Sequence, residues 1–220
     1  MPTALPYIPP ADTGLELVHV DHALIVVAKP AGLLAVPGRG EDKADCLSAR
    51  VQAVYPDALI VHRLDMATSG LMVFGRGLAS QRRLGAAFEQ RLADKRYIAI
   101  VAGVIAADSG EIDLPIGADW ANRPRRQIDL KRGKPALTRF RVIERNVLSD
   151  CSRVALEPVT GRTHQLRVHL LAIGHPIWGD ELYAGEAAAR APRLLLHAES
   201  LSLPHPDDGR MLDFSSPAPF

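Results

Sequence analysis

The chain has 220 residues, 47% of them hydrophobic, and a formal net charge of +1, which fits one domain or a tightly joined pair of lobes. Its two cysteines, Cys46 and Cys151, lack Cys-x-x-Cys spacing and exclude a disulfide framework. The N-terminus carries no signal-peptide pattern, and no apolar run reaches membrane-spanning length. We therefore expect a soluble, cytoplasmic protein with free thiols, working as a monomer without a membrane partner.

The periodicity of apolar residues predicts more strands than helices. We expect an irregular lead over residues 1–14 and a single domain over residues 15–220. The predicted strands cover residues 15–20, 23–28, 58–61, 70–74, 97–104, 138–143 and 153–159. The predicted helices cover residues 46–55, 78–92 and 164–172, with Thr163 as the cap of the last helix. Strands that outnumber helices, with mixed connections, indicate an α+β fold.

Charged and polar residues stand between two apolar runs at His62-Arg63-Leu64-Asp65. Thr68-Ser69-Gly70 has turn chemistry, so Asp65 is expected on a loop at the end of a strand. Loops held by rigid strands often carry catalytic groups, but Asp and Thr are also common turn residues that bond their own backbone. The residue types alone leave both interpretations open.

The positive charge of the chain is concentrated in one stretch. Residues 123–145 hold nine Lys or Arg against two acidic residues, a local charge of +7, so the rest of the chain carries −6. Such asymmetry favours a face that attracts phosphates, because phosphate neutralisation supplies much of the affinity for nucleic acid. A solvated charged loop is the other interpretation.

Several motifs resemble those of the RluA family of RNA pseudouridine synthases. Residues 62–65 followed by 68–70 are similar to the central motif, and the others follow in the family's order at residues 27–32, 95–99, 161–169, 174–177, 179–180 and 193–198. The resemblance implies the pseudouridine synthase catalytic fold, which has a mixed, largely antiparallel central sheet with a cleft. Since only about a dozen residues precede the first predicted strand, we expect no S4-type RNA-binding domain.

The family resemblance also implies an activity, the isomerisation of specific uridines in structured RNA to pseudouridine, with no cofactor and no metal. Residues 119–124 and 133–136 resemble compact members of the family that modify a stem-loop of large-subunit (23S-type) rRNA and a tRNA anticodon stem-loop. RNA of both kinds is therefore the expected partner.

Isomerisation breaks an N-glycosidic bond and joins a carbon of the same base to the sugar, so a carboxylate suits the reaction. The family resemblance implies that Asp65, our candidate nucleophile, attacks or deprotonates the nucleoside, at either its sugar or its base. It also implies that Arg167 is the cationic partner of Asp65, and that Tyr97 stacks on the flipped base and relays a proton. Ordinary structural roles are the other interpretation for Arg167 and Tyr97: a helix-surface arginine and strand packing.

Basic residues are the candidates for RNA contacts. Extruding a base leaves a gap, and the planar cation of Arg63 is suited to fill it, although a salt bridge within the loop is its plainer role. Arg162 stands beside a glycine at an expected helix start and is a candidate phosphate contact. The phosphate-contact candidates in the basic stretch are Arg123, Arg125, Arg126 and Lys131.

The eight histidines raise the possibility of a metal site. His164 and His169 are five residues apart, so they miss the i, i+4 spacing of two ligands on one helix face. We expect His62, His175 and His197 to be hydrogen-bonded structural residues, and no metal. Of three functions considered, the motifs favour a uridine isomerase over a catalytically silent RNA-binding module or a metal-dependent hydrolase.

Overall fold

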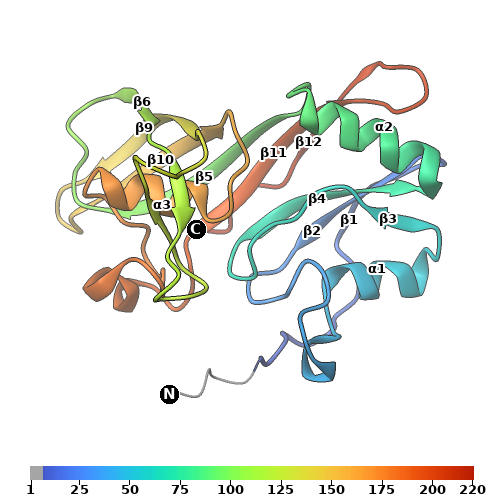
Figure 1. Ribbon diagram of the computed structural model, residues 1–220, viewed down its shortest axis with the longest axis horizontal. Coiled ribbons are helices and arrows are strands. Elements are labelled where there is room, and N and C mark those ends of the chain that lie inside the picture. Colours follow the sequence, from blue (N-terminus) through green and yellow to red (C-terminus); the bar gives the residue numbers. More distant parts are fainter. Residues whose placement is uncertain (1–6) are drawn as a thin grey trace. The chain divides into compact units, whose positions relative to one another are not determined.

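The computed structural model describes residues 7–220, which divide into two compact units (Figure 1). The first unit contains residues 7–93 and Ser202–Ser216, and the second contains Asp94–Leu201 and Pro217–Phe220. Residues 1–6 of the expected lead lie outside the described residues, and residues 7–16 form no helix or strand. The expectation of a single domain over residues 15–220 stays a prediction.

The strands of the first unit form an antiparallel ladder. β1 (Leu17–Val20) pairs with β2 (Leu24–Lys29), β2 pairs with β4 (Ser69–Arg76), and β4 pairs with β3 (Ala58–Ile60). Every residue of β2 is buried, which fits its uninterrupted apolar run. Helix α1 (Leu47–Val54) packs on β3, and α2 (Gly77–Glu89) packs on β3 and β4. A short 3-10 helix, η1 (Glu41–Lys43), lies between β2 and α1 in the chain.

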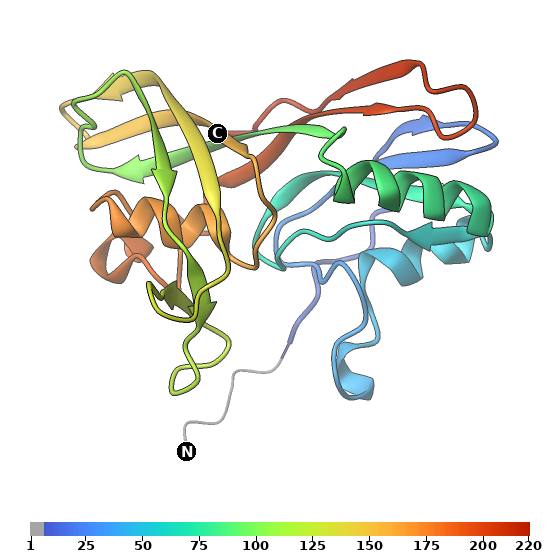
Figure 2. The same ribbon diagram turned by 45° about the horizontal axis from the view of Figure 1, so that its top comes forward.

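The C-terminal part of the chain adds a hairpin to the first unit. β11 (Leu196–Pro204) passes from the second unit into the first at residues 201 and 202, and β12 (Met211–Ser215) pairs with it. The turn between β11 and β12 lies beside the turn between β1 and β2 (Figure 2). The apolar pattern did not predict these two strands.

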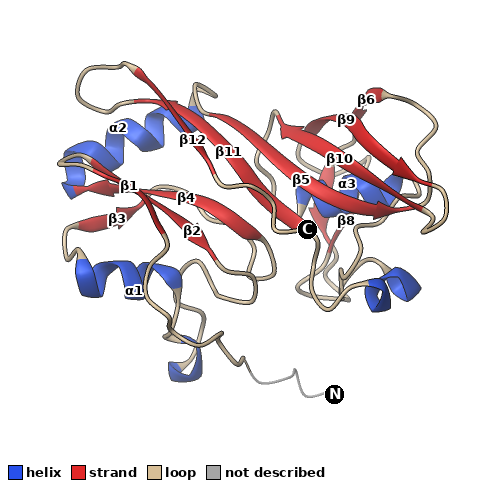
Figure 3. Cartoon of the chain, turned by 180° about the vertical axis from the view of Figure 1, so that it is seen from behind, coloured by secondary structure: helices blue, strands red, loops and turns tan. Residues whose placement is uncertain are grey.

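The second unit contains a second antiparallel ladder, in which β5 (Asp94–Ala102), β10 (Cys151–Pro158), β9 (Leu137–Asn146) and β6 (Ser109–Asp113) follow one another. β7 (Ile116–Ala118) and β8 (Arg126–Ile128) form a separate hairpin. Helix α3 (Gln165–Ala172) packs on β8, β9 and β10 (Figure 3), and the 3-10 helix η2 (Gly185–Arg190) follows it in the chain. The strand pairs named here are antiparallel, which confirms the predicted α+β class and the largely antiparallel sheet, while the expected cleft stays a prediction.

The predicted cap of α3 was wrong. The helix begins at Gln165, and the residue before it, His164, has left-handed backbone angles (φ 57°) and makes no side-chain cap. The Gln165 side chain orders the loop before the helix, because its Oε1 accepts the Arg162 N–H at 3.0 Å and the Thr160 hydroxyl at 2.7 Å. Both donors precede the helix, so these bonds are not a helix cap.

The sequence predicts that no segment of the chain spans a membrane. No helix within residues 7–220 combines the length and the hydropathy that a membrane span requires.

Candidate active site

Asp65 lies on the loop between β3 and β4, as the turn residues predicted, and its side chain is half-buried. The loop closes with a turn in which the Thr68 N–H donates to the Asp65 carbonyl at 3.1 Å. Leu64 and Thr68 are buried on either side, whereas Arg63 and Met66 are exposed. The backbone of Asp65 therefore belongs to a loop that the packing of Leu64 and Thr68 holds on both sides.

A buried lysine ties this loop to the end of β2. Lys29 is 1% exposed, and its ammonium donates to the carbonyls of Pro30, Leu33 and Met66 at 2.7 to 3.0 Å. The Gly32 N–H also donates to the Met66 carbonyl, at 2.9 Å. Hydrogen bonds to a charged donor are the stronger kind, so Lys29 holds the backbone beside Asp65 in place.

His62 fixes the other side of the same loop. Its Nε2 accepts the Val73 N–H of β4 at 3.1 Å, and its ring stacks on Phe88 of α2 with the centroids 4.5 Å apart. The structural role predicted for His62 is thus confirmed. Arg63 follows it and is exposed.

Tyr97 is a half-buried residue of β5 and lies opposite Leu156 of β10. Its strand neighbours Ile98 and Ala99 are buried. The regular antiparallel pairing therefore holds the backbone of Tyr97 on a rigid element. Two residues earlier on the same strand, burial lowers the pKa of Lys95.

Arg167 is buried, so the interpretation as a helix-surface arginine was wrong. Its Nε and Nη2 each donate to the Asp180 carboxylate at 2.7 Å, with the two side chains 5% and 0% exposed. Nη1 takes no part in these two bonds. Asp180 also accepts the N–H groups of Leu182 and Tyr183. The expected pairing of Arg167 with Asp65 stays a prediction.

Gly179 explains why the chain can place Asp180 there. Its φ is +73°, in the left-handed region that favours glycine. A Cβ at this position would meet the Arg193 carbonyl oxygen at 1.8 Å. Only glycine therefore allows the close backbone approach that precedes Asp180.

Tyr183 joins the β7–β8 hairpin to α3. Its hydroxyl accepts the Arg126 N–H at 2.7 Å and lies 2.6 Å from His164 Nδ1, to which it can donate. The guanidinium groups of Arg125 and Arg167 lie over its ring, 5.4 and 5.0 Å from the centroid. Tyr183 also belongs to a small core with Ile116, Ala136 and Val168. The hairpin is therefore held against the helix that carries Arg167.

The basic stretch divides into paired and unpaired cations. Arg139 and Arg145 form ion pairs with Glu111 and Asp108 at 2.8 and 2.7 Å. Within residues 7–220 no acidic side chain pairs with the four phosphate-contact candidates Arg123, Arg125, Arg126 and Lys131. Arg162 is exposed, and its Nε donates to the Pro135 carbonyl at 3.0 Å. These four candidates lie on and just after the β7–β8 hairpin, and Arg141 of β9 also has no acidic partner among the described residues.

The tip of this hairpin carries an exposed aromatic residue. Trp120 is 71% exposed, and the Arg123 guanidinium lies 3.9 Å from the centroid of its ring. A pocket beside β8 is lined in part by Arg125, Arg126, Val168 and Tyr183. Cationic and aromatic groups together suit contacts with phosphates and bases.

Three residues that hold the site together, Lys29, Asp180 and Tyr183, were not predicted from the sequence to have a role in it. Lys29 and Asp180 lie in motifs that were recognised, but nothing in a motif says that a lysine is buried or which cation a carboxylate meets. Tyr183 lies 57 residues from Arg126 along the chain. No spacing pattern reveals such a contact.

Comparison with known proteins agrees with the fold. Residues 23–172 match the family model described as RNA pseudouridylate synthase. The chain belongs to this family, and it is an RNA pseudouridine synthase, an isomerase that converts uridine in RNA to pseudouridine. A catalytically silent RNA-binding module is not favoured.

Its relatives include full-length matches. The dual-specificity RNA pseudouridine synthase RluA of Escherichia coli (strain K12) is 48% identical over 215 residues, which cover 97% of this chain and 98% of that protein. The protein of the same name from Pasteurella multocida (strain Pm70) is 46% identical with the same coverage. Among solved structures, human RNA Pseudouridylate Synthase Domain Containing 1 has a TM-score of 0.80 and 30% identity, covering 97% of this chain and 87% of that one.

Proposed function

We propose that this enzyme modifies uridines in two kinds of RNA, a stem-loop of large-subunit (23S-type) rRNA and a tRNA anticodon stem-loop. The observation that carries the proposal is the 48% identity, over 97% of the chain, to a relative named as dual-specificity. Residues 119–124, at the tip of the β7–β8 hairpin, support it, because they include the exposed Trp120 and Arg123.

For catalysis, we propose that the Asp65 carboxylate is the nucleophile. The support is its position on a loop that Lys29 and His62 hold from both sides, because precise placement of a reacting group supplies much of a rate enhancement. Arg167 is the proposed cation that keeps this carboxylate ionised, and Asp180 fixes its guanidinium plane. Tyr97 is proposed to stack on the flipped base and relay a proton.

For RNA binding, we propose that Arg123, Arg125, Arg126 and Lys131 contact phosphates. The support is that Arg125 and Arg126 line the pocket beside β8 and that none of the four has an acidic partner among residues 7–220. Arg63, exposed two residues before Asp65, is proposed to fill the gap that the flipped base leaves. Arg162 is a further proposed phosphate contact.

We also propose that the enzyme works as a monomer in the cytoplasm. Its cysteines, Cys46 and Cys151, are free and buried, as thiols are in a reducing compartment. Light scattering on the purified chain tests the monomer.

The decisive experiment incubates the purified protein with each of two synthetic stem-loops, one of each RNA kind. Pseudouridine is detected by selective chemical labelling, because isomerisation leaves the mass unchanged. We expect product from both RNAs; product from only one would contradict the dual specificity.

The same assay tests Asp65. Asp65→Asn should abolish isomerisation and leave RNA affinity within about tenfold, since it removes the charge and conserves the shape. Asp42→Asn, at an exposed carboxylate of η1, is the matched control and should retain full activity. Substantial turnover by the Asp65→Asn enzyme would disprove the role of Asp65.

A further inference from the structure

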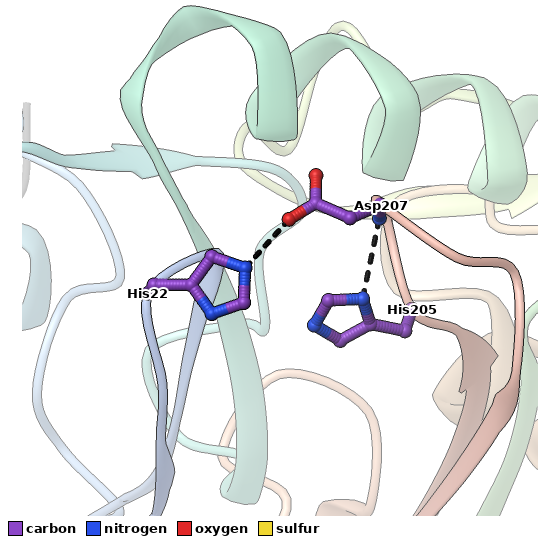
Figure 4. Close-up of side chains that lie close together, drawn as sticks. All are labelled: His22, His205 and Asp207. Atoms are coloured by element: carbon purple, nitrogen blue, oxygen red, sulfur yellow. Dashed lines mark hydrogen bonds and ion pairs between the residues drawn. The ribbon is translucent and has the colours of Figure 1, made fainter.

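Two histidines and an aspartate meet where the β1–β2 turn lies beside the β11–β12 turn, within the first unit (Figure 4). His22 Nε2 lies 2.7 Å from Asp207 Oδ2, and the Asp207 N–H donates to His205 Nδ1 at 3.2 Å. One potential ligand atom from each of the three residues lies within 4.8 Å of the other two. None of these residues belongs to the proposed catalytic or RNA-binding groups.

The buried member of this cluster has an unsatisfied nitrogen. His205 is 4% exposed, and its Nε2 is buried without a hydrogen-bond partner among the described residues. Asp21 Oδ2 lies 3.3 Å from this nitrogen, outside good hydrogen-bond geometry. Figure 4 shows Nε2 on the side of the ring that faces His22. A buried polar atom without a partner is uncommon and calls for a missing ligand or water.

We propose that His22, His205 and Asp207 form a binding site for a divalent transition-metal ion of the zinc class. Imidazole nitrogens and carboxylate oxygens are the usual ligands of Zn²⁺, with bonds of about 2.0–2.2 Å. Such bonds place tetrahedral ligand atoms roughly 3.3 Å apart. The 2.7 Å between His22 Nε2 and Asp207 Oδ2 must therefore lengthen, and the longer separations, of up to 4.8 Å, must shorten. The exposed side chains of His22 and Asp207 can make that adjustment while His205 stays fixed by packing.

Neighbouring charges are arranged to support the ion. The Asp208 carboxylate lies 3.4 Å from His205 Nδ1. With Nδ1 accepting the Asp207 N–H, the neutral ring carries its proton on Nε2. Metal binding moves that proton to Nδ1, which then faces Asp208, and the Asp207 N–H gives up its bond to Nδ1. This carboxylate–histidine–metal arrangement is the usual second layer of a metal site.

Asp207 can bind a metal without losing its other partner. Arg83 Nη1 lies 2.9 Å from Asp207 Oδ1, whereas the bond to His22 uses Oδ2. A metal at Oδ2 would therefore replace only the hydrogen bond from His22. Three protein ligands leave one position for water, as in open zinc sites.

A metal at this position would connect turns that are far apart in the sequence, since His22 and Asp207 are separated by 185 residues. It would join the first hairpin of the first unit to its last hairpin. Any ligand that binds only the folded state stabilises that state. The site is therefore expected to stabilise the first unit.

The test titrates zinc alone into untagged, metal-free protein, by calorimetry and by competition with a chromophoric chelator. We expect one site per chain and a higher melting temperature with zinc. His22→Gln and Asp207→Asn should each weaken zinc binding by at least about tenfold and remove the zinc-dependent rise in melting temperature. Both side chains are well exposed, so these variants should fold.

His175→Gln is the matched control, because this histidine lies in the second unit with its Nδ1 bonded to the Ala102 carbonyl. Its zinc affinity should equal that of the wild type. Cobalt(II) absorption provides a second measurement, with intense ligand-field bands in the wild type that are lost in His22→Gln. Wild-type binding no tighter than that of His22→Gln, or no binding at all, would overturn the proposal.

Discussion

At the scale of single residues, the site depends on buried charges that are individually satisfied. Lys29 is held by three carbonyls and Arg167 by a carboxylate with two bonds of 2.7 Å. Burying a charge is costly unless hydrogen bonds and an opposite charge offset the lost hydration. Such groups keep the loops and helix ends around them in one geometry.

The Arg167–Asp180 pair predicts a large effect on stability. Asp180→Asn leaves the Arg167 guanidinium buried without its counter-charge, so the free energy of unfolding should fall by about 3–5 kcal/mol. Urea unfolding measures it. Glu181→Gln removes the neighbouring, exposed carboxylate and should change stability by less than about 0.5 kcal/mol. Equal, small effects of both changes would show that the pair is not needed to hold Arg167.

The two functions proposed for Tyr97 differ only at its hydroxyl. Tyr97→Phe keeps the stacking ring and removes the proton relay, so loss of uridine should continue while release of pseudouridine fails. Tyr97→Ala should lose both. Single-turnover kinetics on one stem-loop measures the two steps separately. A wild-type rate in Tyr97→Phe would leave Tyr97 as a stacking residue only.

At the scale of secondary-structure elements, the β7–β8 hairpin and β9 differ in how many of their cations are paired. In β9, Arg139 and Arg145 are paired with acidic residues and Arg141 is not. Arg125 and Arg126, which contact Tyr183, have no acidic partner among residues 7–220. An unpaired cation gains more from a phosphate, because no existing ion pair must break.

This difference predicts the salt dependence of RNA binding. Neutralising Arg125, Arg126 and Lys131 together should weaken affinity for every RNA sequence and flatten the plot of log affinity against log salt by roughly 0.7–0.9 for each true contact. Arg139→Gln, the paired control, should leave the slope unchanged. Filter binding over a salt series measures it. If the triple variant has the wild-type slope, the stretch is a solvated loop.

At the scale of the whole molecule, acid should destabilise the two units in different pH ranges. His169, in the second unit, is fully buried, with its Nε2 donating to the Leu114 carbonyl and its Nδ1 accepting from Thr138. Burial lowers the pKa of His169. As the pH falls, His169 is therefore protonated in the unfolded chain before it is protonated in the folded one. Its contribution to the free energy of unfolding is complete above about pH 6.5 and is lost as the pH falls below that value.

Asp21, in the first unit, responds at lower pH. Its burial acts to raise the pKa, but hydrogen bonds from His19 and from the Leu24 and Ala23 amides outweigh burial and lower it. Because the pKa of Asp21 is lowered in the folded state, its ionised carboxylate adds to the free energy of unfolding above about pH 3.9. This contribution is lost as the pH falls further.

Urea unfolding at a series of pH values tests both stages. His169→Gln should reduce the loss of stability that begins below about pH 6.5, and Asp21→Asn should reduce the loss below about pH 4. An unchanged pH profile in either variant would show that its residue does not control that stage.

The sequence by itself determined the α+β class, the positions of the longer helices and of most longer strands, and the loop that carries Asp65. These features depend on local chemistry, because apolar periodicity selects helix or strand. The turn itself lies at residues 66–67, and Ser69 and Gly70, predicted as turn residues, begin β4. The nine-residue strand β11 was missed. The short strands β6, β7 and β8 were missed because three to five polar or mixed residues carry no such period. Thr163 was misassigned as a cap because a favourable residue type near a helix start does not fix the backbone angles, and His164, in the left-handed region, takes the position before the helix.

Only the tertiary structure decided which groups meet. Arg167 and Asp180 are 13 residues apart, Tyr183 and Arg126 are 57 apart, and His22 and Asp207 are 185 apart. Each contact forms because packing of separate elements brings the side chains together. For the buried Arg167–Asp180 pair, hydrogen bonds and opposite charge offset the cost of burial. A linear pattern records the residue types but not their separation in space. Neither the Arg167–Asp180 pair nor the cluster of His22, His205 and Asp207 can therefore be recognised before the chain is folded.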